Sequence, residues 1–197
     1  VGAITATQIK SLSAANLSAL SEAQTGALTT TQLASLSTAQ VGALSATDIG
    51  ELDATQIGAL TATQLSRLST EAVVALDATQ IGGLNTTQLQ SFVTTQMGAL
   101  GAGDISEFNE TQIAQLTATQ VRSLTATAVG ALADTQIAAL TTAQVQSLST
   151  TSLADLDTTQ VAALTTTQVR SITVAQISAL STGDVQEFTT DQIAALT

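Results

Sequence analysis

Thr5-Ala-Thr-Gln-Ile-Lys-Ser-Leu12 is the first full copy of an eight-residue phrase that fills the chain. The phrase reads Ser or Thr, two variable residues, Gln, an aliphatic residue, two variable residues and Leu. Residues 5–196 hold 24 copies without insertion or deletion. A fixed period this short predicts a solenoid or a fibre rather than an ordinary globular domain. We therefore treat residues 1–197 as a single continuous repeat array and expect it to be a segment of a longer one.

Each octad carries two signals for the start of a helix. Position 1 is Ser, Thr, Asp or Asn in 21 of the 24 copies, and position 4 is Gln in 17. Ser or Thr followed three residues later by Gln is a capping box, in which each side chain accepts a hydrogen bond from the backbone amide of the other residue. The Leu before the cap and the aliphatic residue at position 5 form the hydrophobic staple that accompanies such a box.

These signals predict that every octad is a separate helix of about six residues, because an N-cap residue has non-helical backbone angles. One continuous helix is disfavoured, since positions 5 and 8 would spiral off any one face. The Thr content suits a β-solenoid, but strand faces need even spacing and positions 5 and 8 have opposite parity. The sequence thus predicts an all-α solenoid of short capped helices, with a β-solenoid as the alternative.

A longer period runs over the octads. Lys10, Arg67, Arg122 and Arg170 each stand beside Ser at positions 6 and 7, in octads 1, 8, 15 and 21. Seven octads for two turns would give about 3.5 octads, or roughly 28 residues, per superhelical turn. We expect each short helix to stack on the helices three and four octads away.

The core is expected from positions 5 and 8, which are aliphatic or Phe in almost every copy, while position 2 is expected to be exposed. Burying one such side chain contributes roughly 1.5–3 kcal/mol. Most glycines occupy position 6. Glycine inside a helix costs about 0.5–1 kcal/mol relative to Ala, so its recurrence predicts a close approach of backbones there.

Composition excludes several classes of function. The chain has no Cys, His, Trp, Tyr or Pro, so it lacks thiol nucleophiles, imidazole metal ligands and the Ser-His-Asp triad. Four cations stand against fifteen carboxylates, a net charge of −11, which argues against nucleic acid or an anionic membrane as partner. No run approaches the roughly 20 apolar residues of a membrane span. We expect no enzyme activity, no cofactor and no membrane insertion.

Three octads pair Asp at position 4 with Glu at position 7, where carboxylates three residues apart share a helix face. These pairs are Asp48/Glu51, Asp104/Glu107 and Asp184/Glu187. Ca²⁺ takes six to eight oxygen ligands, and each pair supplies too few locally. The preferred interpretation is that Asp suits the positive end of a helix dipole and that Glu is solvated. Calcium binding is kept as an alternative, together with ice binding by Thr-x-Thr rows such as Thr5/Thr7.

Octads such as Leu60-Thr-Ala-Thr-Gln-Leu65 and Leu164-Thr-Thr-Thr-Gln-Val169 resemble the Thr/Gln/Ala/Leu-rich octapeptide arrays of very large bacterial secreted or cell-surface proteins, often labelled adhesin-like. The resemblance covers the whole chain but rests on one simple motif. It implies an extracellular, bacterial, structural role as a stalk, a fibre or an extender of an adhesin. It carries over no functional residue.

The function expected from these observations is a non-enzymatic scaffold, either a spacer or a filament-forming segment. Apolar residues at the two ends, Val1, Ile4, Ile193 and Leu196, would meet those of a neighbouring copy as octads meet inside the array. A second copy is therefore the expected partner, bound end to end or side by side. The runner-up is a binding module for ice or calcium.

Overall fold

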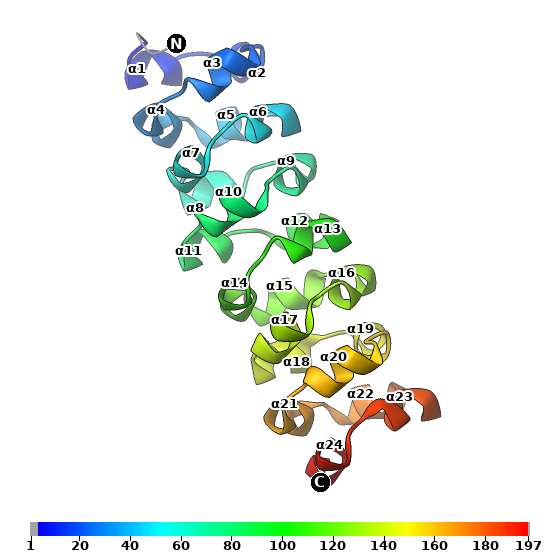
Figure 1. Ribbon diagram of the computed structural model, residues 1–197. Coiled ribbons are helices and arrows are strands. Elements are labelled where there is room, and N and C mark those ends of the chain that lie inside the picture. The colour runs from blue at the N-terminus through cyan, green and yellow to red at the C-terminus, as the bar shows by residue number, and fades with distance from the viewer. Residues whose placement is uncertain (1–3, 197) are drawn as a thin grey trace. The chain divides into compact units, whose positions relative to one another are not determined.

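The computed structural model describes residues 4–196, and every helix or strand assigned among them is a short α-helix. The helices fall into two units, residues 1–99 and 100–197, and each is described by itself (Figure 1). The predicted all-α array is confirmed. Residues 4–196 contain no strand, so the β-solenoid alternative is wrong.

The first unit contains helices α1 to α12, with these bounds: α1 Ala6–Lys10, α2 Ala14–Ser18, α3 Glu22–Gly26, α4 Thr30–Ser35, α5 Thr38–Val41, α6 Ala46–Gly50, α7 Ala54–Gly58, α8 Ala62–Leu65, α9 Thr70–Val74, α10 Ala78–Gly82, α11 Thr86–Leu89 and α12 Thr94–Ala99. The second unit contains helices α13 to α24, with these bounds: α13 Ala102–Ser106, α14 Glu110–Gln115, α15 Ala118–Ser123, α16 Ala126–Gly130, α17 Asp134–Ala139, α18 Thr142–Ser147, α19 Thr150–Ala154, α20 Thr158–Ala163, α21 Thr166–Ser171, α22 Val174–Ala179, α23 Thr182–Glu187 and α24 Thr190–Ala195. One helix per octad is what the sequence predicts.

Helix α18 shows how an octad begins and ends. Thr141 has extended backbone angles (φ −73°, ψ 158°), and its Oγ1 accepts from the amide of Gln144 at 3.2 Å. The Gln144 Oε1 accepts in return from the amide of Thr141 at 2.7 Å. The helix ends at Leu148, whose angles (φ −55°, ψ 141°) are again extended. Each Leu–Thr junction is therefore a corner, because two consecutive residues leave helical geometry.

The two halves of the capping box work independently. Ala133 and Val93 have no capping side chain, yet their amides donate to a Gln Oε1 three residues on, at 2.7 and 2.8 Å. Ala72 and Ala128 lack the Gln, yet their amides donate to the hydroxyl of the preceding Ser or Thr at 3.1 Å. Each helix start thus tolerates the loss of either partner, which explains how irregular copies keep the fold.

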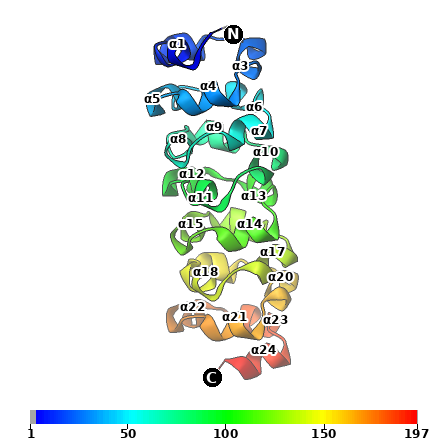
Figure 2. The same ribbon diagram turned by 90° about the vertical axis from the view of Figure 1, so that its left-hand side faces the viewer.

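Helices stack in columns by steps of three octads. In the second unit α15 packs on α18, α18 on α21 and α21 on α24, while α14, α17, α20 and α23 form another column. Figure 2 shows α15 and α18 on one side and α17, α20 and α23 on the other. The first unit repeats the arrangement, with α5 on α8 and α8 on α11. The predicted contact at three octads is confirmed. The connection at four octads is made by side chains, as shown below.

Positions 5 and 8 form a narrow aliphatic core in each unit. Ile137 and Val145 at position 5 are fully buried, and Leu140 and Leu148 at position 8 are 4% exposed. Position 2 departs from the expectation in part. It is exposed in all but one of the copies where it is Thr, the exception being Thr70, but half-buried in several copies where it is Ala, as at Ala118. A short side chain there leaves its Cβ partly covered by the rest of the octad.

The expected close approach at position-6 glycines holds at one site and fails at another. A Cβ at Gly42 would lie 2.9 Å from the carbonyl oxygen of Arg67, three octads later, so only glycine fits. A Cβ at Gly82 would meet nothing within 4 Å. Replacing Gly82 by Ala therefore has room, whereas a side chain at Gly42 would push two stacked helices apart.

Replacing Leu116 by Ala tests the core. Leu116 is 4% exposed, and truncating a buried Leu costs about 2–5 kcal/mol. Thr119→Ala, at an exposed position of the next octad, serves as the control and should change the free energy of unfolding by less than about 0.5 kcal/mol. Urea denaturation measures both. Equal effects at the two positions would refute the assignment of the core.

Candidate functional site

The Gln side chain at position 4 is the one polar group that recurs inside each unit. Gln144 is 1% exposed. Its Oε1 serves the capping box, and its Nε2 donates to the carbonyl oxygens of Ile113 and Leu116, both at 2.7 Å. One amide therefore starts its own helix and also binds the end of an earlier helix and the corner after it. We call the set of these bridging side chains the glutamine ladder.

The ladder has a nearly constant spacing. In most members the amide donates to carbonyls 31 and 28 residues earlier, at positions 5 and 8 of the octad four before. This holds in both units for Gln64, Gln80, Gln96, Gln144, Gln168, Gln176 and Gln192. In Gln56, Gln88 and Gln160 the acceptor 28 residues earlier is kept, and the other acceptor is the position-6 glycine carbonyl 30 residues earlier. A separation of 28 residues is 3.5 octads, the turn length predicted from the sequence. Each of these Gln side chains thus connects its own helix to the octad four before, whereas the main helix contacts are between octads three apart.

Sequence reasoning missed this second bond of the Gln side chain. A capping box accepts Glu as readily as Gln, yet no octad has Glu at position 4. A carboxylate can accept from the cap amide but cannot donate, whereas an amide does both. The sequence signal for the ladder is that Gln fills position 4 in 17 of the 24 copies and Glu in none.

Asp48, one of the residues of the alternative calcium-binding interpretation, is 6% exposed and is surrounded by hydrogen-bond donors. Its Oδ2 accepts from the amide and the hydroxyl of Ser45, both at 2.8 Å. Its Oδ1 accepts from the hydroxyl of Thr25 at 3.3 Å. Thr25 is the one polar residue at position 5, and its hydroxyl gives the buried carboxylate a donor. Glu51 is exposed at the C-cap of α6, so Asp48 and Glu51 lie at opposite ends of one helix.

The other two pairs are arranged similarly. Asp104 and Asp184 each use Oδ2 to accept from the amide at their own N-cap, at 2.7 and 2.6 Å. Glu107, at the C-cap of α13, and Glu187, the last residue of α23, lie at the far ends of the same helices. The Asp carboxylates therefore cap helices, which leaves fewer of their oxygens for a cation.

Glu107 lies instead beside Glu110 in a cavity of about 330 Å³ with a mixed polar and apolar lining, which also includes Asn109, Thr135 and Gln136. Hydrogen bonds from its own backbone amide and from the Thr135 hydroxyl lower the pKa of Glu110. A lowered pKa keeps this carboxylate charged at neutral pH. Among residues 4–196, no group of three or more His, Cys, Asp or Glu is placed to hold a metal ion.

Charged side chains of the second unit are unevenly distributed among the columns. Arg122 and Arg170 lie in the column of α15, α18, α21 and α24, where Asp191 of α24 is the one carboxylate within the helices. Glu110, Asp134 and Asp184 lie in the column of α14, α17, α20 and α23. The column of α14, α17, α20 and α23 therefore contains acidic side chains and no Lys or Arg within its helices, and we call its surface the acidic flank.

No helix within residues 4–196 has both the length and the hydropathy of a membrane span. A family model described as the ALTTAQ repeat matches residues 26–54 and 137–174, about a third of the chain. No curated protein matches the sequence. The family match and the repeated helices together identify the chain as a helical repeat array.

Gln144→Glu separates the two bonds of the ladder. The variant keeps an acceptor for the Thr141 amide but turns a carboxylate toward the carbonyls of Ile113 and Leu116. We expect a loss of about 3–5 kcal/mol at pH 7, the usual cost of an uncompensated buried charge. Burial and the facing carbonyls would raise the pKa of the introduced carboxyl in the folded state. The loss should therefore shrink as pH falls through that raised pKa, because the protonated acid can donate.

The matched control is Gln146→Glu, which adds the same charge at an exposed position of the same helix. Its effect should stay within about 0.5 kcal/mol. Chemical denaturation between pH 4 and pH 8 measures both variants. If Gln144→Glu were as mild as its control at pH 7, the ladder would not stabilise the stack.

Proposed function

We propose that this chain is a non-enzymatic structural scaffold, a spacer or filament-forming segment of a large bacterial secreted or cell-surface protein. The glutamine ladder is the observation that carries the proposal. The ladder repeats one interaction in every turn. Its Gln amides, the recurring buried polar groups, bind backbone carbonyls of the preceding turn and do not line a cleft. An array whose turns are joined by the same type of hydrogen bond keeps a fixed length and direction, as a spacer must.

A spacer must be stiff, and spin labels measure stiffness directly. The chain has no Cys, so introduced cysteines are the sole labelling sites. Arg122, Gln146 and Arg170 are exposed and follow one another along the column of α15, α18 and α21. Double electron–electron resonance would be recorded for Arg122→Cys/Gln146→Cys and for Arg122→Cys/Arg170→Cys. We expect narrow distance distributions, with the second mean about twice the first, because stacking adds equal steps.

The same two labelled chains in denaturant provide the control, where both distributions should be broad. Broad distributions in the native protein, with a mean distance that grows as the square root of the residue separation, would show a flexible chain and reject the spacer.

The proposed extracellular location has its own test. Antibodies against the array should label intact cells of the source bacterium, and labelling only after permeabilisation would reject an extracellular site.

Calcium binding is the alternative with a specific observation in its favour, the cavity shared by Glu107 and Glu110. Under the scaffold proposal, the melting temperature should be the same in Ca²⁺ and in chelator. A calcium site would raise the melting temperature in Ca²⁺, and Glu107→Gln/Glu110→Gln would abolish the rise. Asp134→Asn, elsewhere on the acidic flank, is the control and should leave any rise intact.

Ice binding is the second alternative. Thr117 and Thr119 of one octad and Thr165 and Thr167 of another are exposed in the same column. Repeated hydroxyls on one flank are the observation that favours it. An ice-recrystallisation assay with the Thr117→Val/Thr165→Val variant as comparison tests the idea. Recrystallisation at the rate of buffer alone would remove this alternative.

A further inference from the structure

The chain contains three Asn residues, and each is followed two residues later by Ser or Thr. Asn-x-Ser/Thr, with any residue except Pro in the middle, is the acceptor motif of N-linked glycosylation. Asn16 lies at position 4 of its octad, whereas Asn85 and Asn109 lie at position 1, where the side chain caps a helix. The motif arises easily in a chain rich in Ser and Thr, so the structure around each Asn decides whether it can accept a saccharide.

Asn16 is poorly placed for this modification. It lies within α2, and Leu17, the middle residue of its motif, is fully buried. A transferase has to bind all three motif residues from solution, which would draw Leu17 out of the core. Burying such a side chain contributes roughly 1.5–3 kcal/mol, so the folded array disfavours Asn16 as an acceptor.

Asn109 is placed differently. It is exposed, as are Glu110 and Thr111, the other two residues of its motif. Its backbone is extended (φ −77°, ψ 168°) because it is the N-cap of α14. The Oδ1 accepts from the amide of Gln112 at 2.9 Å, whereas Nδ2 and the Thr111 hydroxyl donate to no group within residues 4–196. The nitrogen that would receive a saccharide is therefore free.

Glycosylation at Nδ2 would leave the helix cap intact. An Asn-linked saccharide replaces one hydrogen of Nδ2 and leaves Oδ1 as an acceptor, so the bond from the Gln112 amide survives. Glu110 and Thr111 are the first two residues of a six-residue helix. Such a helix has little stability of its own, and its end opens at low cost in free energy. A transferase can therefore bind the motif without unfolding the turn.

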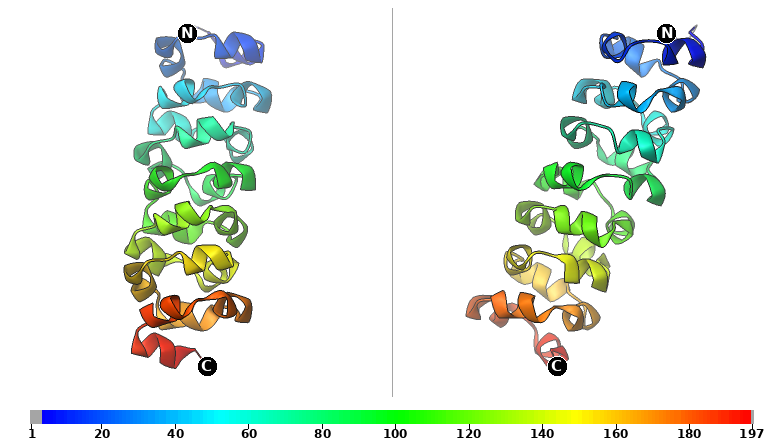
Figure 3. Two further views of the ribbon diagram at one scale, coloured as in Figure 1. Left: turned by 90° about the vertical axis from the view of Figure 1, so that its right-hand side faces the viewer. Right: turned by 180° about the vertical axis from the view of Figure 1, so that it is seen from behind.

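The cavity shared by Glu107 and Glu110 lies beside Asn109, which also lines it. Its other walls come from α17, which packs on α14 in the next turn. Figure 3 shows these two helices in the green to yellow-green part of the ribbon. The cavity of about 330 Å³ has room for one saccharide ring. The two carboxylates accept hydrogen bonds from sugar hydroxyls, and Ala131 and Ala133 offer apolar contact to the carbon-bound hydrogens of the ring.

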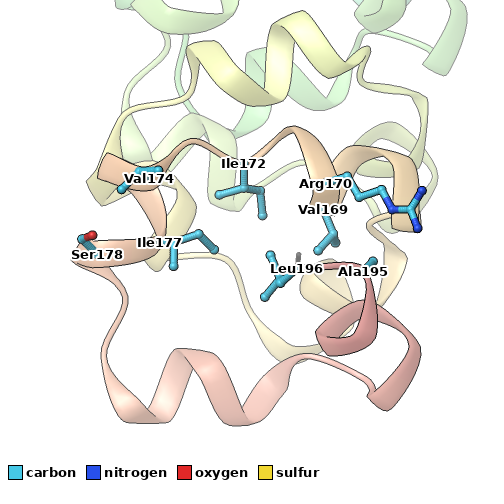
Figure 4. A pocket seen from close by; sticks show the side chains of 8 residues that line it. All are labelled: Val169, Arg170, Ile172, Val174, Ile177, Ser178, Ala195 and Leu196. Atoms are coloured by element: carbon cyan, nitrogen blue, oxygen red, sulfur yellow. The ribbon is translucent and has the colours of Figure 1, made fainter.

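A second cavity, of about 250 Å³, has a different lining. Aliphatic side chains, among them Ile172 and Leu196, extend toward its centre (Figure 4). No Asn lines it, so it offers no acceptor for a saccharide. Leu196 is also one of the apolar residues predicted to meet a second copy. Of the others, Ile4 is half-buried and Ile193 is 42% exposed, while Val1 lies outside the described residues.

We propose that Asn109 is an acceptor of N-linked glycosylation and that the first saccharide lies in the cavity beside it. The donor is a saccharide whose anomeric carbon is joined to a polyprenyl diphosphate. The Asn109 Nδ2 forms a bond to that carbon, and the bond from the carbon to the diphosphate oxygen breaks. The diphosphate leaves with the electron pair, and a base of the transferase takes the proton from Nδ2.

Glu107 favours a lipid-linked donor. It stands two residues before Asn109, a place where bacterial transferases that use such donors recognise a carboxylate. The proposal goes beyond the scaffold function and uses the proposed surface location only to bring the chain to the transferase.

Mass spectrometry of the array isolated from the source bacterium tests the proposal. Trypsin cleaves after Arg67 and Arg122, so residues 68–122 form one peptide that contains Asn85 and Asn109. We expect a mass above that of the bare peptide by one saccharide chain or more, and fragmentation that places a saccharide on Asn109. A peptide with Asn109 unmodified would overturn the proposal. It would leave the scaffold intact, because spin labels and antibodies test that function separately.

Variants produced in the same bacterium separate the motif from the fold. Asn109→Asp keeps the cap, since Asp157 caps its helix by accepting from the Gln160 amide at 2.8 Å, but it has no Nδ2. Thr111→Ala removes the motif hydroxyl at an exposed position. Both should lose the saccharide at residue 109 and melt as the unglycosylated chain does. Thr111→Ser should keep it, and so should the matched control Asn85→Asp. A saccharide that persists on Asn109 in Thr111→Ala would overturn the proposal.

Two further measurements test the donor and the cavity. Glu107→Gln should lower the glycosylated fraction severalfold, and an unchanged fraction would reject the lipid-linked donor. Nuclear Overhauser contacts are expected between the first saccharide and the methyl groups of Ala131 and Ala133. Their absence in the glycosylated chain would reject the placement in the cavity.

Discussion

The array depends on one side-chain amide that both accepts and donates. Each ladder Gln uses its oxygen to begin its own helix and its nitrogen to hold two carbonyls of the preceding turn, as Gln144 does. A helix of four to six residues has no independent stability in water. Most of its carbonyls are also terminal and need partners outside the helix. The amide meets both needs, because the bond that satisfies an earlier helix end also fixes the position of the next helix.

The narrow core follows from the same constraint. Backbones must come close enough for a Gln side chain to span them, and aliphatic residues at positions 5 and 8 fill the remaining space without large rings. Where the ladder is interrupted, the neighbourhood adjusts in different ways. Asp48 recruits the hydroxyl of Thr25, and Ala72 and Ala128 are fully buried with no polar side-chain group to satisfy. The interruptions therefore leave the stack intact while changing its local strength.

The short helices, their caps, the apolar core and the 28-residue turn could be predicted from the sequence, because each rests on local spacing. The bridging bonds of the ladder could not be read from one octad, since the capping box already accounts for the Gln in full. The hydrogen bond between Thr25 and Asp48 joins residues 23 positions apart. Because Thr25 is the one polar residue at position 5, no repeated sequence pattern predicts this bond. The spacing of the acidic pairs predicts shared helix faces, whereas in the structure each Asp side chain caps the start of its helix and its Glu partner lies at the other end.

The reach of the ladder also sets how such a chain would respond to tension. The bridging bonds span 28 to 31 residues, so each is broken by the loss of one turn and is unaffected by events further along. A load on the ends would then peel the array turn by turn, and each release would free about 28 residues, or roughly 90–100 Å of extended chain. Because interruptions of the ladder change the local strength of the stack, successive releases would occur over a range of forces. The scaffold would lengthen in many small steps under load and would shorten again as each turn re-forms.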